Sequence, residues 1–429
     1  MAQVTLMQLA EQLWSLNRSL TGEGNRETLR LIENYVGVKL AHTKFPSGKQ
    51  VLDWKIPQEW HVSEAYIIDP KGQKILNFRE NNLHLLAYSS SVRSVLSLEE
   101  LQPHLISLPE QPDAIPYATS YYSQNWGFCI SHDEREKLSP GKYEVVIDST
   151  YKDSYLYCSE FYFPGTSNKE IFLSTYICHP SMANDNLSGP LVAAEIARTI
   201  AKEYALRPRK FSLRIVFLPE TIGSIALISE KLSSMKKNII AGYVLTCVGD
   251  ERTWSFLPSR NANTIADKMA LRVLRANLKS FEIYDWKYRG SDERQYCSPG
   301  VDLPVASIMR SKYGTFPEYH TSKDKLGSVV TSKGLEESTQ LYLELIEALQ
   351  NYSAPTSTHL CEPNMGKRNL YPTLSQKNVW TNTRDLMSVL SYCDGKNDFL
   401  DIASLVGLTP EEVNQCILTL EAHQLVSFS

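Results

Sequence analysis

The sequence predicts an α/β protein in which a mainly parallel sheet is flanked by helices. Apolar strand-like runs alternate with helical segments from about residue 170 to residue 350, at the spacing of βαβ units. In addition, residues of catalytic or metal-binding type follow the ends of several of these runs. Open α/β sheets place their binding and active sites at the carboxyl ends of their strands. With 429 residues and 42% hydrophobic content, the chain also has room for further domains.

The main domain is expected to be discontinuous, with residues 1–58 and 153–352. Two helices are predicted across residues 5–35, broken at Thr21-Gly22-Glu23-Gly24. Residues 59–152 consist of short β-like runs separated by Pro and Gly turns, which indicates a small inserted β-rich domain. The later strands are predicted at 171–177, 212–218, 242–248 and 303–309, with helices after Leu187, after Ser224, from about Thr264 and through 336–349.

A winged helix-turn-helix domain is expected over residues 370–429, after a linker at 353–369. Helices are predicted near 383–393, 399–405 and 410–423, with Gly407 in the last turn and Thr409 as a cap. Three Lys and Arg against seven Asp and Glu give this region a net charge of −4. An acidic recognition helix would repel phosphates, so we expect packing or self-association here and no nucleic acid partner.

Composition restricts the other classes of function. The formal net charge of the chain is −4, which provides no basic field for nucleic acid. The sequence starts without a basic segment followed by an apolar one, and it has no run of about 18 apolar residues, so we expect a cytoplasmic protein that makes no membrane contact. Eight scattered cysteines without a CxxC pair fit reduced thiols.

Histidines and carboxylates follow the predicted strands. His179 and Asp185 come after the first, and Glu220 follows the second in Pro219-Glu220-Thr221. Gly290-Ser291-Asp292-Glu293-Arg294 precedes the strand at 303–309, and Tyr319-His320-Thr321 follows it. Imidazole and carboxylate groups that converge from separate strand ends suit zinc or a similar ion.

Together these motifs resemble the zinc-dependent aminopeptidase family over about residues 1–60 and 150–350. The resemblance is carried by His179, by Asp185 before Asn186-Leu187-Ser188-Gly189, by Glu220, by Ser291-Asp292 and by Tyr319-His320-Thr321. More closely, the chain resembles a bacterial group with an inserted β-rich domain and a C-terminal winged helix, described alongside polysaccharide biosynthesis. The resemblance implies that His179, Asp185 and His320 bind zinc and that Glu220 is the general base. Tyr319 would either donate to an oxyanion or only pack.

Two positions depart from the family pattern. Thr221 stands where a second Glu is usual, and Thr246 stands where an Asp ligand is usual. Because a neutral hydroxyl is a poor zinc ligand, we expect one zinc ion, with Asp250 as the alternative ligand for a second. Asp292, Glu293 and Arg294 form a charged cluster that would bind a substrate amine or carboxylate, or else make an ion-pair network.

The leading hypothesis is a metal-dependent hydrolase of amide bonds, acting like an aminopeptidase on small peptides. One alternative is an amide hydrolase for N-acylated sugar or amino-acid conjugates. The other is a non-catalytic regulatory protein, in which the hydrolase scaffold holds a metal or ligand and the winged helix transmits the signal. Self-association is left open.

Overall fold

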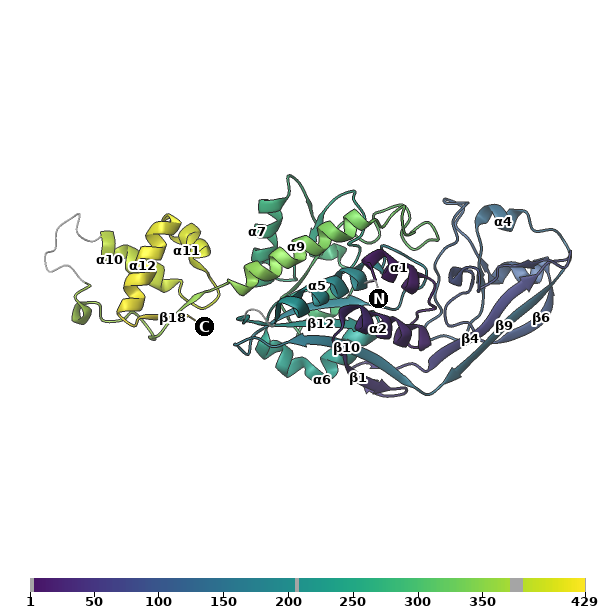
Figure 1. The fold of residues 1–429 in the computed structure, drawn as a ribbon, viewed down its shortest axis with the longest axis horizontal. Coiled ribbons are helices and arrows are strands. Elements are labelled where there is room, and N and C mark those ends of the chain that lie inside the picture. Colours follow the sequence, from purple (N-terminus) through teal and green to yellow (C-terminus); the bar gives the residue numbers. More distant parts are fainter. Residues whose placement is uncertain (1–3, 205–207, 371–380, 429) are drawn as a thin grey trace. The chain divides into compact units, whose positions relative to one another are not determined.

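The computed structural model describes residues 4–204, 208–370 and 381–428. The chain forms two compact units, Met1–Glu347 and Ala348–Ser429 (Figure 1). The first contains a large sheet with its helices and a smaller sheet, and the second is mainly helical.

The large sheet has eight strands in the order β1-β10-β12-β11-β13-β16-β14-β15. Its four neighbouring strands β12, β11, β13 and β16 are parallel. At one edge β1 and β10 pair antiparallel with their neighbours, and at the other β14 pairs antiparallel with β16 and parallel with β15. The sheet is therefore mixed at its edges and parallel at its centre. The strands are β1 Ala41–Pro46, β10 Tyr155–Phe163, β11 Glu170–Tyr176, β12 Ser212–Leu218, β13 Ile239–Val244, β14 Ser255–Leu257, β15 Glu282–Ile283 and β16 Val305–Met309.

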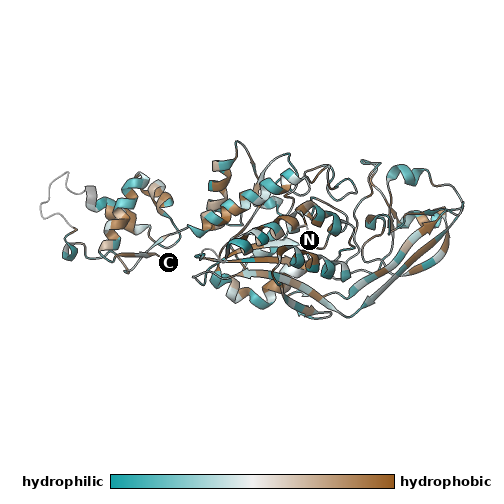
Figure 2. Cartoon of the chain, in the orientation of Figure 1, coloured by the Kyte–Doolittle hydropathy of each residue, from teal (hydrophilic) through white to brown (hydrophobic). Residues whose placement is uncertain are grey.

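Helices cover both faces of this sheet. The connection β11–α5–β12 and the connection β12–α6–β13 run in opposite directions across the sheet, so right-handed crossovers place α5 and α6 on opposite faces, as Figure 1 shows. Figure 2 shows hydrophobic and hydrophilic residues alternating along these helices, as expected where one side packs on a sheet. The helices are α1 Leu6–Trp14, α2 Glu23–Val36, α5 Ser188–Tyr204, α6 Ile222–Asn238, α7 Ile265–Asn277, α8 Glu293–Tyr296 and α9 Ser332–Gln350.

A second, four-stranded sheet in the order β5-β4-β9-β6 lies between β1 and β10 in the sequence. Its long strands β4 and β9 pair antiparallel, and buried residues of both sheets, such as Ala65 and Phe172, belong to one hydrophobic cluster. The inserted sheet therefore shares a core with the large one. The elements here are β2 Gln50–Val51, β3 Trp54–Lys55, β4 Glu59–Ile68, β5 Lys74–Ile75, β6 Val92–Ser97, α3 Leu98–Leu101, β7 Leu105–Ile106, β8 Phe128–Cys129, α4 His132–Glu136 and β9 Lys142–Lys152.

The C-terminal unit contains α10 Thr381–Ser391, α11 Phe399–Val406, α12 Pro410–Ala422 and a two-stranded sheet of β17 Pro355–Ser357 and β18 Val426–Phe428. Asp398 and Thr409 cap α11 and α12 with their side chains, and Gly407 ends α11 in the left-handed region. Residues 353–369, expected as a linker, thus include a strand, and Met365 lies in the core of this unit. Residues 371–380 of the expected domain lie outside the described residues.

The strands and helices expected from the pattern are present, although several ends differ by a few residues, and the end of β13 bears on the site. The run expected at 242–248 forms a strand only to Val244. Cys247 has φ 51°, in the left-handed region, so the chain leaves the sheet there although Leu245 to Val248 are buried. Among the described residues, no helix is both long and apolar enough to cross a bilayer.

Candidate functional site

The site lies beyond the carboxyl ends of the parallel strands. His179 and Asp185 follow β11, Glu220 follows β12, Thr246 follows β13, and His320 lies on the segment after β16. The loop after β11 closes tightly against the sheet, because Gly189 has no room for a side chain: a Cβ there would lie 2.3 Å from the Leu245 carbonyl oxygen. Because β12, β11, β13 and β16 are parallel, their carboxyl ends lie at the same edge of the sheet.

His179, Asp185 and His320 gather at this point. Nε2 of His320 lies 2.8 Å from Oδ2 of Asp185, and Nδ1 of His179 lies 3.8 Å from Oδ1. His179 and Asp185 are buried, whereas the His320 side chain is 35% exposed. Nδ1 of His179 has no hydrogen-bond partner in the described structure.

The protonation states of two of these groups suit metal binding. Burial lowers the pKa of His179 to about 4, so its imidazole is neutral near pH 7. Although burial opposes ionisation of Asp185, His179 and His320 together hold its pKa at about 2. Neutral imidazole and ionised carboxylate are the forms that coordinate a cation.

Glu220 lies beside His179, with Oε2 3.7 Å from Nε2. Burial and the neighbouring carboxylates of Asp292 and Asp185 raise the pKa of Glu220 well above its usual range, while Arg294 opposes the rise. Burial also raises the pKa of Asp292, to about 6. The site therefore holds several carboxylates in a small volume, and a cation would relieve their repulsion.

The two threonines that depart from the family pattern are occupied by other contacts. Thr221, at φ 64°, donates its N–H to Asp292 and accepts a hydrogen bond of 2.7 Å from Nη2 of Arg294. The Thr246 hydroxyl shares a 2.7 Å hydrogen bond with the hydroxyl of Tyr176. Both oxygens of Asp250 accept hydrogen bonds, including those from the Asn184 amide and the Ser311 N–H and hydroxyl. Asp250 therefore has a structural role in this loop.

The charged cluster after Ser291 divides into buried and exposed parts. Asp292 and Glu293 are fully buried, and Glu293 accepts hydrogen bonds from the Gly290 and Ser291 N–H groups and from the Tyr313 hydroxyl. Arg294 is exposed and has no ion-pair partner among the described residues. Only Arg294 of the three is directed to solvent.

Tyr319 lies against a histidine of the site. Its ring stacks on His320, with 3.9 Å between ring centroids and 12° between planes. It also packs against Phe316. The ring therefore supports His320, and both the oxyanion role and the packing role of Tyr319 stay predictions.

Three further residues of the site carry no recognisable sequence pattern. Arg18 is buried and donates from Nε and Nη2 to the His179 carbonyl, at 2.9 and 2.7 Å. Asp324 accepts from the Asn184 and Asp185 N–H groups, and Tyr117 places its ring edge against His179 and His320. Asp324 lies four residues after His320, within the same polar segment, and could have been considered. Nothing local in the sequence distinguishes Arg18 or Tyr117.

The side chains gathered at this point carry the kinds of chemical group that coordinate a divalent cation. It offers a buried imidazole nitrogen without a partner, an ionised carboxylate and a second imidazole. In the described part of the chain these contacts are pairwise, and no group of three or more His, Cys, Asp or Glu side chains is arranged as a formed metal site. At the two positions where the family pattern has further acidic ligands, this chain has the hydroxyls of Thr221 and Thr246, which are poor zinc ligands.

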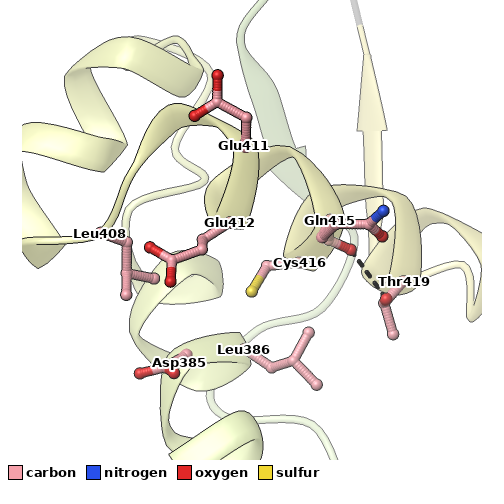
Figure 3. A pocket seen from close by; sticks show the side chains of 8 residues that line it. All are labelled: Asp385, Leu386, Leu408, Glu411, Glu412, Gln415, Cys416 and Thr419. Carbon is pink, nitrogen blue, oxygen red and sulfur yellow. Dashed lines mark hydrogen bonds between the residues drawn. The ribbon is translucent and has the colours of Figure 1, made fainter.

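A separate groove lies in the C-terminal unit between α10 and α12 (Figure 3). It has a volume of about 490 Å³, with Leu386 and Leu408 among its apolar residues and the half-buried Cys416 between them. The charged residues that line this groove are all acidic: Asp385, Glu411 and Glu412. The first turn of α12, the third helix of this unit, is thus acidic.

The first unit is an α/β structure with histidines and carboxylates gathered at its strand ends, and a mainly helical unit follows it in the chain. Residues 7–352 match the family described as a domain of unknown function, DUF4910, and residues 353–428 match a winged helix-turn-helix family. The chain therefore belongs to the DUF4910 family.

Two relatives span nearly the whole chain. A Clostridium acetobutylicum protein named "Putative polysaccharide biosynthesis protein with aminopeptidase-like domain" is 40% identical over 402 residues, which is 93% of this chain and 91% of that protein. A crystal structure described as a "putative peptidase" from the same species is 38% identical with a TM-score of 0.80, covering 99% of this chain and 96% of the other.

A more distant structure shares the fold. A zinc aminopeptidase from Bacillus subtilis is 13% identical with a TM-score of 0.56, covering 80% of this chain and 93% of the other. The α/β class predicted from the sequence and the C-terminal winged helix are thereby confirmed.

Proposed function

We propose that this protein is a metal-dependent hydrolase of amide bonds that acts like an aminopeptidase. The observation that carries the proposal is the convergence of His179, Asp185 and His320 with Glu220 lying 3.7 Å from His179. His179, Asp185 and His320 would hold one zinc ion. When bound, such an ion polarises a substrate carbonyl and makes a water molecule easier to deprotonate.

Glu220 acts as the general base in this proposal. Its carboxylate takes the proton of the attacking water and passes it to the leaving amine. A base must be ionised before it can accept that proton, and a cation held by His179 and Asp185 would favour this by lowering the raised pKa of Glu220. Tyr319 would hold His320 in place, and its hydroxyl is our candidate donor to the oxyanion.

Arg294 is our candidate for substrate binding. Asp292 and Glu293 are fully buried and bonded to their own segment, so they favour a structural role. The exposed guanidinium of Arg294 beside Glu220 offers several unused donors, which suits a carboxylate near the scissile amide. Small peptides and N-acylated amino-acid or sugar conjugates are therefore both candidate substrates, and the second class agrees with a relative named for polysaccharide biosynthesis.

The regulatory alternative keeps one supporting observation, the appended C-terminal unit. Its acidic α12 and the groove of Figure 3 disfavour a phosphate backbone as partner. We therefore propose protein contact, and no nucleic acid contact, for this unit.

Metal content tests the main proposal. Elemental analysis of the purified protein should give about one zinc per chain, and both His179→Ala and His320→Ala should lose it. His61→Ala, at an exposed position of β4, is the matched control and should keep it. No zinc in the wild type after reconstitution, or undiminished zinc in both site variants, would refute the proposed centre. A screen with aminoacyl anilides and N-acyl amino acids then identifies the substrate class.

A further inference from the structure

A segment of the inserted domain, residues 111–117, reaches the candidate metal site. Residues 111–117 run beside the segment that carries His320, with an antiparallel bridge between Pro116 and Thr321. The N–H of Tyr117 donates to the His320 carbonyl at 2.8 Å, and the Ser322 N–H donates to the Ile115 carbonyl at 2.8 Å. Two parts of the chain about 200 residues apart are thus joined on both sides of His320.

The Tyr117 ring contacts both histidines. Its centroid lies 5.3 Å from that of His179 and 5.3 Å from that of His320, with the planes nearly perpendicular at 90° and 83°. Edge-to-face contacts of this kind fix the orientation of both rings. Tyr117 is thus a side chain from the inserted domain that contacts both imidazoles.

Tyr117 is itself anchored in the inserted domain by further aromatic residues. Its hydroxyl lies 3.0 Å from the Tyr121 hydroxyl, and the Tyr121 ring packs edge-on against Tyr88. Tyr88 stacks on Trp60 of β4, whose Nε1 donates to the Ser89 carbonyl. A continuous series of rings therefore connects the inserted sheet to the two histidines.

His320 needs such support because of its backbone. Its φ is 54°, in the left-handed region, which is strained for a residue with a side chain and persists only where the surrounding structure holds it. The bonds from Tyr117 and Ile115 supply that restraint.

We propose that the inserted domain completes the metal site, with Tyr117 as the positioning residue that orients His179 and His320. This inference rests on the proposed function, since it takes the two histidines as ligands. Under this proposal, the inserted domain takes part in forming the metal site. Groups that orient metal ligands typically change metal affinity by about 10–100-fold when they are removed.

Cobalt(II) and zinc(II) binding to the full chain test the inference. Tyr117→Ala should weaken zinc binding by about 10–100-fold in competition with a chromophoric chelator and should alter the visible spectrum of the cobalt form. Tyr117→Phe keeps the ring contacts and should retain affinity close to wild type. Tyr122→Ala is the matched control, because Tyr122, five residues after Tyr117, is 54% exposed and its ring contacts Trp54. Wild-type affinity and spectrum in Tyr117→Ala would overturn the inference while leaving the metal site intact.

A metal-independent measurement separates this inference from the proposed function. If the wild type binds neither ion, the proposed function fails, and the ring signals of His179 and His320 in NMR decide the positioning role. One sharp set in the wild type and Tyr117→Phe, with multiple or broadened sets in Tyr117→Ala, supports it. Equally sharp sets in all three overturn it. If Tyr117→Ala does not fold, Tyr117→Leu, which keeps apolar volume without a ring, replaces it in both measurements with the same expected outcomes.

Discussion

Replacing Arg18 by Met tests how the buried guanidinium supports the site. Arg18 is 2% exposed, donates to the His179 carbonyl through two nitrogens, and donates to the Leu13 carbonyl at 2.6 Å. A Met side chain has a similar volume, but the carbonyl oxygens of His179 and Leu13 then lose their hydrogen-bond donor. Each loss costs about 1–3 kcal/mol of stability. Removing the buried positive charge offsets part of this loss of stability. Burial disfavours the charged guanidinium, because it lowers the pKa of Arg18 to about 10. We therefore expect Arg18→Met to lower the free energy of unfolding by about 2–4 kcal/mol.

Two measurements follow this change. Urea denaturation gives the free energy of unfolding, and chelator competition gives the zinc affinity, which should fall because the carbonyl of His179 is no longer held. Arg30→Met is the control, since Arg30 is exposed and pairs with Glu27 on the same helix, and its stability should stay close to wild type. If Arg18→Met unfolds within about 0.5 kcal/mol of wild type and keeps its zinc affinity, Arg18 does not position His179.

Three further changes have defined outcomes. Glu220→Gln should lower kcat about 100-fold or more and leave zinc content unchanged, whereas full activity would remove Glu220 as the base. Glu59 is 2% exposed, and its bidentate pair with Arg26 lowers its pKa to about 2. The ionised carboxylate therefore stabilises the folded state by on the order of 2 kcal/mol. This stabilisation is complete above about pH 4.5 and is lost as pH falls toward 2. Glu59→Gln should therefore flatten the decline of unfolding free energy with acid, and an unchanged decline would contradict this. Arg294→Gln should raise KM for a substrate with a carboxylate near the scissile bond but not for its neutral amide, and equal effects on both would argue against an anion site.

Much of the fold could be predicted because it is local in origin. The alternation of apolar runs and helical segments predicted β11 and β12 to within a residue, and Thr409 as a cap predicted where α12 begins. The end of β13 was placed too late, because an apolar run reports burial and a buried loop is as apolar as a strand.

The sequence by itself determined which residues stand at the strand ends. His179, Asp185, Glu220 and His320 could be proposed as a group, because parallel strands bring their carboxyl ends to the same edge of the sheet.

Only the tertiary structure decided how these residues are held and which neighbours are available. Arg18 and Tyr117 contact His179 from segments 161 and 62 residues away along the chain. Asp250, which the sequence offered as a second ligand, is occupied by loop hydrogen bonds. Such contacts depend on how distant elements pack, and neither periodicity nor motif spacing contains that information.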